Sequence, residues 1–148
     1  MSALFAQSGS IRDDFESFSS LDFVDFSANL FTGSLPSSIF DLQNLRFLYL
    51  SNNQFGSTLP ENWGNAAMLR DIFLDNNSLE GTVPEISPGD FSRLTELLLN
   101  GNQITGSMAA SVCELRTSAL LEDLWTDCAG SPPEIQCPLP SCCTFCFQ

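Results

Sequence analysis

The sequence contains no histidine, a single tyrosine, and only 5 basic residues against 18 acidic ones. Without histidine, the chain lacks the commonest general base and the commonest metal ligand of proteins. Its formal net charge of −13 repels phosphate backbones, which argues against binding of nucleic acid. A basic protein, a polyamine or a divalent cation matches this charge better.

Long apolar runs are also missing. No segment approaches the roughly 20 apolar residues of a membrane-spanning helix, and residues 1–7 show neither the basic stretch nor the apolar core of a secretion signal. Yet all 6 cysteines follow residue 112, which indicates local disulfides formed in an oxidising compartment. We therefore expect a secreted or organelle-lumen protein, not membrane-spanning, in a mature or truncated form with Met1 added.

Motifs of catalysis are absent from the sequence. There is no Gly-rich phosphate loop and no nucleophile elbow. The adjacent carboxylates of Glu122 and Asp123 would point to opposite faces of a strand and form a poor catalytic pair. We expect no enzyme, no cofactor and no metal.

What the sequence does contain is a repeat of about 24 residues. Counted from its first leucine, it has apolar residues at positions 1, 4, 6, 11 and 15, asparagine at 9, glycine at 13 and proline at 16. Four copies begin at Leu21, Leu45, Leu69 and Leu94, with Ser57 and Ala109 in place of one glycine and one proline. Partial copies flank them, at residues 9–18 and at 121–126.

Each repeated position has a physical reason. Alternation around positions 4 to 6 predicts a short strand with positions 4 and 6 turned inward, and strands of successive copies pair in a parallel sheet. The asparagine follows the strand, where its side chain can bond backbone groups of neighbouring turns. We expect these asparagines to form a ladder: Asn29, Asn53, Asn77 and Asn102.

The pattern resembles the plant-type leucine-rich repeat, LxxLxLxxNxLxGxIP, found in receptor-kinase ectodomains and in secreted polygalacturonase-inhibitor-like proteins. The resemblance implies an α/β repeat fold: a right-handed solenoid with a parallel β-sheet on its concave face. It also implies a second short sheet near residues 31–35 and 55–59, which we expect to fray at Ser57 and Ala109. The cysteine-paired N-terminal cap of that family is missing. We divide the chain into a partial repeat (1–20), four repeats (21–112) and a last strand with a Cys-rich cap (113–148).

The Cys-rich tail indicates three disulfides that cap the end of the solenoid. The sequence does not select a pairing, but Cys113 and Cys128 should each bond into the tail, because only that fastens it to the repeats. The alternative is a zinc site built on the Cys143-x-x-Cys146 spacing. The ending CCTxCF resembles the caps of secreted diatom and algal repeat proteins. The cysteines concerned are Cys113, Cys128, Cys137, Cys142, Cys143 and Cys146.

Function in such a solenoid is expected on the concave face. Outward positions there combine aromatic residues with carboxylates, which is typical of a protein-binding site; the alternative is that the aromatic residues only pack on one another. The candidate binding residues are Phe23, Asp25, Phe47, Tyr49, Asp71, Phe73, Glu96, Leu98 and Trp125. The carboxylates expected on this face are Asp22, Asp25, Asp71, Asp75, Glu96, Asp123 and Asp127. Asn76, in Asn-Asn-Ser, is a candidate glycosylation site.

The predicted function is recognition of a protein or peptide of basic character. One alternative is an assembly subunit that docks, or self-associates, through an uncapped N-terminal edge. That edge would be formed by Leu4, Phe5, Ile11, Phe15 and Phe18. Another alternative is a secreted enzyme inhibitor, as in the relatives that the resemblance names.

Overall fold

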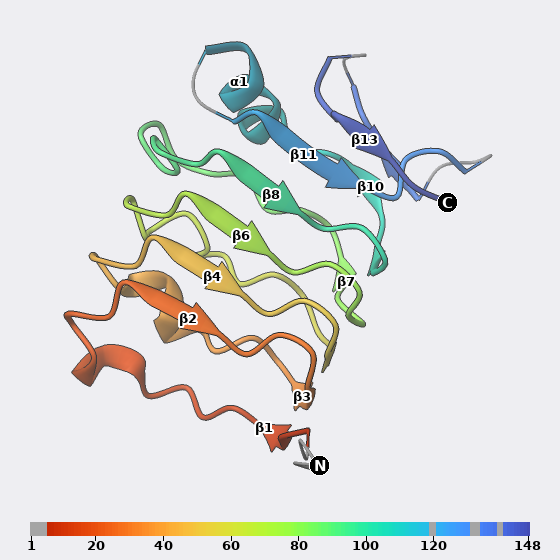
Figure 1. Cartoon of the computed structure of the whole chain (residues 1–148). Helices are drawn as coiled ribbons and strands as arrows, with labels where there is room; N and C mark the ends of the chain where they lie inside the picture. The colour runs from red at the N-terminus through yellow and green to blue at the C-terminus, as the bar shows by residue number, and fades with distance from the viewer. Residues whose placement is uncertain (1–5, 119–120, 131–133, 139–140) are drawn as a thin grey trace.

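Six short parallel strands lie side by side and form the main sheet of the solenoid (Figure 1). The structure is a computed structural model that describes residues 6–118, 121–130, 134–138 and 141–148. The order of the sheet is β2-β4-β6-β8-β11-β13, so each coil adds one strand next to the previous one. The strands are β2 (Phe23–Asp25), β4 (Phe47–Tyr49), β6 (Asp71–Phe73), β8 (Glu96–Leu98), β11 (Asp123–Thr126) and β13 (Phe145–Cys146).

The middle residue of each repeat strand points into the core. Leu48, Ile72 and Leu97 are fully buried, while the residues on either side of them in the strand are partly exposed. The strands cover repeat positions 3 to 5, one residue earlier than the alternation predicts, and position 6 (Leu50, for example) is buried just after the strand ends.

A second, interrupted sheet runs along the neighbouring side of the coils. Its pieces are β1-β3-β5, β7-β9 and β10-β12. Their bounds are β1 (Ser8–Ser10), β3 (Leu30–Gly33), β5 (Gln54–Phe55), β7 (Glu80–Gly81), β9 (Gln103–Ile104), β10 (Gly106–Ser107) and β12 (Ile135–Gln136).

The second sheet breaks where Ser57 replaces glycine. Between β5 and β7 only the single bridge Thr58↔Glu80 remains, and Ser57 takes φ 69°, a conformation in which a side chain is strained and glycine is not. At Ala109 the expected fraying does not occur, because Met108 N still donates to Gln136 O (2.8 Å).

The predicted asparagine ladder is confirmed. In one rung, Asn53 donates from Nδ2 to the carbonyls of Phe26 (2.8 Å) and Leu50 (3.1 Å), and its Oδ1 accepts from Phe31 N (3.0 Å). Asn77 and Asn102 repeat this arrangement one and two coils further on. The ladder thus pairs main-chain groups that the turn after each strand leaves without a partner.

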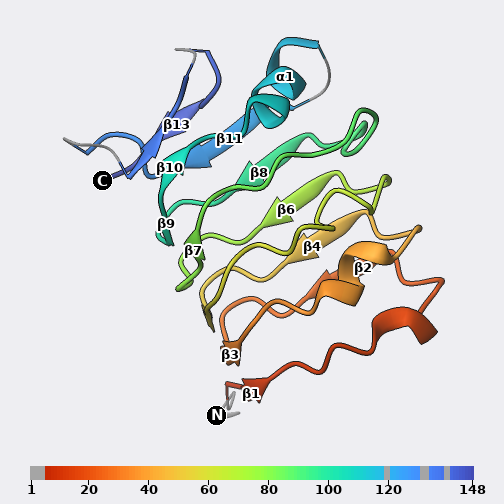
Figure 2. The same cartoon turned by 180° about the vertical axis from the view of Figure 1, so that it is seen from behind.

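The back of the solenoid closes the core (Figure 2). It carries two short 3-10 helices, η1 (Phe15–Ser17) and η2 (Ser37–Asp41), and the helix α1 (Ala110–Ser118). Phe40 of η2 is fully buried, and Trp63 packs edge-to-face on Phe91 with ring centroids 5.0 Å apart. Within the described residues, no helix combines the length and hydropathy needed to span a bilayer.

Three disulfides hold the C-terminal cap: Cys113–Cys142, Cys128–Cys146 and Cys137–Cys143. Cys113, in α1, and Cys128, just after β11, each bond into the tail, as the sequence analysis expects. Each disulfide contributes on the order of 2–4 kcal/mol. The predicted fold, a leucine-rich-repeat solenoid with a parallel sheet and a disulfide-rich cap, is confirmed. The resemblance of the cap to algal proteins stays a prediction.

The tail also forms two strands that the sequence analysis did not predict. β12 pairs with β10 of the second sheet, and β13 pairs with β11 of the main sheet. The Cys-rich segment therefore adds one strand to each of the two sheets of the solenoid, although it lacks the leucine pattern.

Candidate recognition surface on the open face of the main sheet

Two rows of side chains cross the open face of the main sheet, the face turned away from the core. Because the strands are parallel and in register, equivalent residues of successive coils lie directly opposite each other. The first row, here called the central row, contains Asp25, Tyr49, Phe73, Leu98, Trp125 and Phe145. The second, the flanking row, contains Phe23, Phe47, Asp71, Glu96 and Asp123.

The aromatic residues at the N-terminal end of the face form one packed cluster. Tyr49 stacks on Phe73 with centroids 4.6 Å apart and planes at 11°. Phe23 meets Tyr49 edge-on at 5.4 Å and Phe47 at 6.3 Å. These contacts stabilise the sheet, yet Phe23 keeps 47% of its surface exposed. The aromatic cluster therefore stabilises the sheet and still leaves Phe23 accessible to a partner.

A second aromatic cluster lies at the C-terminal end. Trp125 packs against Phe145 (4.9 Å between centroids) and Phe147 (5.5 Å). Phe145 and Phe147 were not predicted as surface residues, because the tail they belong to was expected to be only a disulfide cap. The signal was the alternation of Phe145, Cys146 and Phe147, which has the period of a strand.

The carboxylates of Asp71, Glu96 and Asp123 are adjacent on the flanking row. Burial, and then the charges of Asp71 and Asp123, raise the pKa of Glu96 above its ordinary value. Burial and the Asp71 charge also raise the pKa of the Tyr49 hydroxyl, which donates to Asp71 Oδ2 (3.1 Å). No arginine forms an ion pair with these three carboxylates within the described part of the chain. We call them the acidic row.

Other carboxylates of the face have local partners. Asp22 forms an ion pair with Arg46 (2.6 Å), whose guanidinium lies 5.3 Å from the ring centroid of Phe47. Asp25 accepts from the backbone of Ser27 (2.9 Å). The hydroxyl of Ser51 donates to Asp75.

The expectation for Asp127 is wrong, because this carboxylate is not part of the surface. Asp127 is buried and accepts from the backbone N–H groups of Gly101 (3.0 Å) and Asn102 (3.2 Å). In the coil before, the equivalent N–H groups of Asn76 and Asn77 donate to main-chain carbonyls of the next coil. The side chain of Asp127 therefore replaces those carbonyls where the repeat ends.

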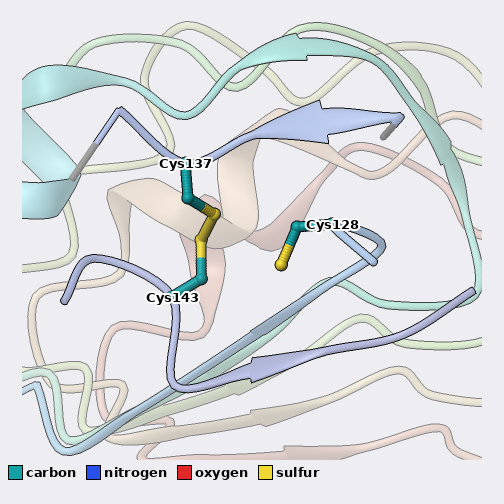
Figure 3. Close-up of side chains that lie close together, drawn as sticks. All are labelled: Cys128, Cys137 and Cys143. Atoms are coloured by element: carbon teal, nitrogen blue, oxygen red, sulfur yellow. A yellow bond between two sulfur atoms is a disulfide. The ribbon is translucent and has the colours of Figure 1, made fainter. Parts of the chain in front are cut away.

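Three cysteine sulfurs come together in the cap, and Figure 3 shows two of them joined in the Cys137–Cys143 disulfide. The sulfurs of Cys128, Cys137 and Cys143 lie within 4.8 Å of one another. Cys137 is bonded to Cys143, and Cys128 to Cys146, so none of these sulfurs is a thiolate. A zinc ion needs thiolate ligands, which speaks against the zinc alternative for the oxidised cap.

The candidate glycosylation site, Asn76, lies beside the open face. Its side chain is exposed and donates from Nδ2 to Asp75 Oδ2 (2.7 Å). The backbone of Asn76 has φ 54°, in the left-handed region. Its side chain lies close to Gly101 of the next coil, where an added Cβ would come within 2.5 Å of Asn76 Oδ1. Glycosylation of Asn76 stays a prediction.

Comparisons with known proteins agree with this fold. The family model described as Leucine Rich Repeat matches residues 44–66 and 93–115. No curated protein sequence matches the chain.

Three solved structures show the similarity in detail. The structure of PEPR1–AtPEP1 is 33% identical over 72% of this chain, with a TM-score of 0.67. The ectodomain of the plant receptor kinase GASSHO1/SCHENGEN3 from Arabidopsis thaliana, in complex with CASPARIAN STRIP INTEGRITY FACTOR 2, is 28% identical over 88% (TM-score 0.69). The Arabidopsis receptor kinase HAESA, with the peptide hormone IDA and the co-receptor SERK1, is 26% identical over 95% (TM-score 0.70).

The chain covers only 15%, 16% and 24% of these three proteins, respectively. The similarity therefore concerns a short stretch of their repeats. The repeat pattern, the stacked parallel strands and the asparagine ladder nevertheless agree with it over most of this chain. The chain therefore carries leucine-rich repeats of the plant type and has the fold of these receptor ectodomains.

Proposed function

We propose that the chain is a non-catalytic recognition module, extracellular or secreted, whose open face binds an extended peptide or protein segment of basic character. The observation that carries the proposal is the side-by-side arrangement of two rows. An apolar central row, from Tyr49 to Phe145, runs next to the acidic row, whose carboxylates have no cationic partner in the described chain.

The two rows suit different parts of one ligand. Aromatic side chains such as Phe73 and Trp125 supply rigid apolar contact area at little cost in conformational entropy. Burial, and then the charges of Asp71 and Asp123, raise the pKa of Glu96. An arginine or lysine placed beside Glu96 would form ion pairs and relieve the repulsion between these carboxylates. A segment that alternates apolar and basic side chains would meet both rows.

The setting and the neighbours support this reading. Three disulfides are typical of an oxidising compartment, and two of the similar structures are complexes with a peptide hormone or an integrity factor. Both of these complexes are formed by much longer chains than this one. For this chain, peptide binding is therefore proposed from its own central row and acidic row.

The test is a synthetic peptide array that varies apolar and basic positions independently, followed by affinity measurements on the best binder. We expect Phe73→Ala and Trp125→Ala each to weaken binding about tenfold or more, as for central anchors of an interface. The matched control is Leu30→Ala, which removes an apolar side chain 47% exposed in β3, away from the face. The double variant Glu96→Gln with Asp71→Asn removes two charges and keeps the side-chain shapes. It should weaken peptide binding and make the affinity less dependent on salt concentration.

The outcome is read together with stability, because the aromatic residues also pack on one another. If Tyr49→Ala with Phe73→Ala lowers the free energy of unfolding but leaves peptide affinity unchanged, the rings serve only the sheet. Equal binding of acidic and basic peptides would contradict the proposed partner.

A further inference from the structure

Two of the three disulfides of the cap lie against each other. The Sγ atom of Cys128 is bonded to Cys146, yet it lies within 4.8 Å of both sulfurs of the Cys137–Cys143 disulfide. Figure 3 shows the Cys128 side chain beside that disulfide. Disulfides exchange by attack of a thiolate on a disulfide sulfur. A thiolate at Cys128 would therefore stand next to a second disulfide that it can attack.

The exposure of the cysteines indicates where an external thiol can enter. Cys146 is exposed, and its partner Cys128 is half-buried. Both cysteines of the third disulfide, Cys113–Cys142, are buried, with 3% and 1% of their surfaces exposed. Exchange requires access to the sulfur that is attacked. A thiolate from solution therefore reaches Cys146 first, and Cys128 leaves with the electron pair of the broken bond.

A buried hydroxyl distinguishes the two sulfurs of the neighbouring disulfide. Thr126 is fully buried, and its Oγ1 donates to Cys143 Sγ (3.7 Å). A hydrogen-bond donor stabilises the charge of a thiolate, and the better stabilised thiolate leaves more readily. Attack by Cys128 on the sulfur of Cys137, with Cys143 as the leaving thiolate, is therefore favoured over the opposite direction.

We propose that the cap is a thiol–disulfide exchange site for an external monothiol, at which the two neighbouring disulfides change partners. The pairs Cys128–Cys146 and Cys137–Cys143 become Cys128–Cys137 and Cys143–Cys146. The second new pair has the C-x-x-C spacing that redox-active disulfides use. The exchange is separate from the rows of the open face and does not depend on the function proposed for them.

Each step breaks one sulfur–sulfur bond and forms another. The external thiolate attacks Cys146 Sγ, so a mixed disulfide forms at Cys146 and Cys128 leaves as a thiolate. Cys128 then attacks Cys137 Sγ, and Cys143 leaves with the electron pair of that bond. Finally, Cys143 attacks Cys146 Sγ and expels the external thiolate. The monothiol is regenerated, and no net oxidation or reduction takes place.

The exchange changes how β13 is attached to the solenoid. In the present pairing, Cys146 of β13 is bonded to Cys128, just after β11, and the two strands are neighbours in the main sheet. In the exchanged pairing, Cys146 is bonded within its own tail, so β13 loses its covalent connection to the coil of β11. Phe145 then separates more readily from Trp125, whose ring centroid lies 4.9 Å from its own. The monothiol thereby acts on the C-terminal aromatic cluster of the open face.

The probe is cysteamine, a small monothiol whose ammonium group suits a chain of net charge −13. The intact, oxidised protein is incubated with cysteamine, and free thiols are then blocked with N-ethylmaleimide in acid. Proteases cut the chain after Glu134 and after Phe145, so that Cys146 is carried by the piece 146–148. Tandem mass spectrometry without reduction identifies the partner of each cysteine.

The expected result is a change of partner that is confined to the two neighbouring disulfides. The piece that carries Cys146 should shift from Cys128 to Cys143, and a new link should join Cys128 to Cys137. The buried third disulfide should stay intact in the same digest, where it serves as the internal control.

Two variants test the direction of attack without any added thiol. In Cys146→Ser, Cys128 starts without a partner, and we expect N-ethylmaleimide to label Cys143, because Cys128 displaces it from Cys137. Adding Thr126→Val to this variant removes the hydroxyl and keeps the shape of the buried side chain. It should lower the ratio of label at Cys143 to label at Cys137 by about tenfold. Thermal unfolding shows whether the variants are folded; if they are not, the mapping of the unaltered protein decides.

Four results would overturn the proposal. Cysteamine bound at Cys146 beside an unchanged Cys137–Cys143 disulfide would show that Cys128 does not attack. Label confined to Cys128 in Cys146→Ser would show the same. Label mainly at Cys137 in that variant would mean that the attack runs in the opposite direction. Scrambling that includes the buried third disulfide would mean that the cap unfolds before it exchanges, which contradicts a defined site.

Discussion

Removal of an asparagine side chain from a buried rung of the ladder should cost far more stability than removal of the same side chain at the exposed N-terminal end of the ladder. The perturbation is Asn102→Ala. Asn102 is 8% exposed, donates to the carbonyls of Leu74 (3.0 Å) and Leu99 (2.9 Å), and accepts from Leu79 N (3.0 Å). The Leu74 carbonyl keeps a second donor, Asn77 Nδ2 (3.1 Å).

The magnitude follows from the groups that are left without a partner. Alanine leaves two buried groups unpaired, the N–H of Leu79 and the carbonyl of Leu99. An unsatisfied buried group costs about 1–3 kcal/mol, so the free energy of unfolding should fall by about 3 kcal/mol. Asn29, at the N-terminal end, bonds the carbonyls of Phe26 and Ser27 and accepts from Gln7 N at the exposed first coil. Water can replace these bonds, and Asn29→Ala should cost about 1 kcal/mol.

The assay is urea unfolding of the oxidised protein, followed by circular dichroism and tryptophan fluorescence. Coincident transitions would show that a single free energy describes each variant. Asn102→Asp serves as a third variant, because its carboxylate keeps the acceptor for Leu79 N but faces two carbonyls without a donor. It should be no more stable than Asn102→Ala. Equal losses in Asn29→Ala and Asn102→Ala, or a loss below about 1 kcal/mol in the latter, would refute the reasoning.

Three further predictions concern charge and the cap. Glu96→Gln should stabilise the fold at neutral pH by about 0.5 kcal/mol, because like charges opposite each other in a sheet repel. The pKa of Glu96 is raised in the folded protein, so this gain should disappear as acid protonates the carboxyl. Thermal unfolding at neutral and at acidic pH would check this. Glu85 accepts from the side chain and backbone of Ser111 at the start of α1, and these bonds lower its pKa. Its stabilisation is therefore fully present above the unfolded pKa and is lost as pH falls through the lower folded pKa. Glu85→Gln should cost about 0.5 kcal/mol at neutral pH, after solvent screening, and this cost should vanish only in acid strong enough to protonate the carboxyl in the folded protein. Removal of one disulfide, in Cys128→Ala with Cys146→Ala, should cost about 3 kcal/mol in urea unfolding and shift tryptophan emission to the red as β13 separates from β11; an unchanged spectrum would show that β13 pairs without the bond.

Much of the fold could be predicted from the repeat because each coil meets only its neighbours. A leucine at the same place in every coil has the same surroundings, so local pattern and tertiary position agree. This holds for Leu48, Ile72 and Leu97 in the core and for the asparagine ladder. It also holds for the outward direction of Tyr49 and Phe73, which the alternation alone predicts.

Prediction was poorest where the repeat ends, because there a side chain has a different neighbour on one side. Asp127 falls at an outward position of the pattern, yet no further repeat supplies carbonyls for Gly101 and Asn102, and its carboxylate turns in to replace them. Phe145 lies in a tail without the leucine pattern of the repeat, and it joins Trp125 because Cys128–Cys146 holds the tail beside β11.

The sequence by itself determined the coil: which residues turn inward, where the strands lie, and that the cysteines cap the C-terminal end. Only the tertiary structure decided the surfaces. The repeat predicts Asp71, Glu96 and Asp123 on this face, but only the structure shows that they lie directly opposite one another without a cationic partner in the described chain, whereas Asp127 turns inward. Periodicity specifies what each residue does within its own coil, whereas a surface that crosses coils, or ends them, depends on how the coils are stacked.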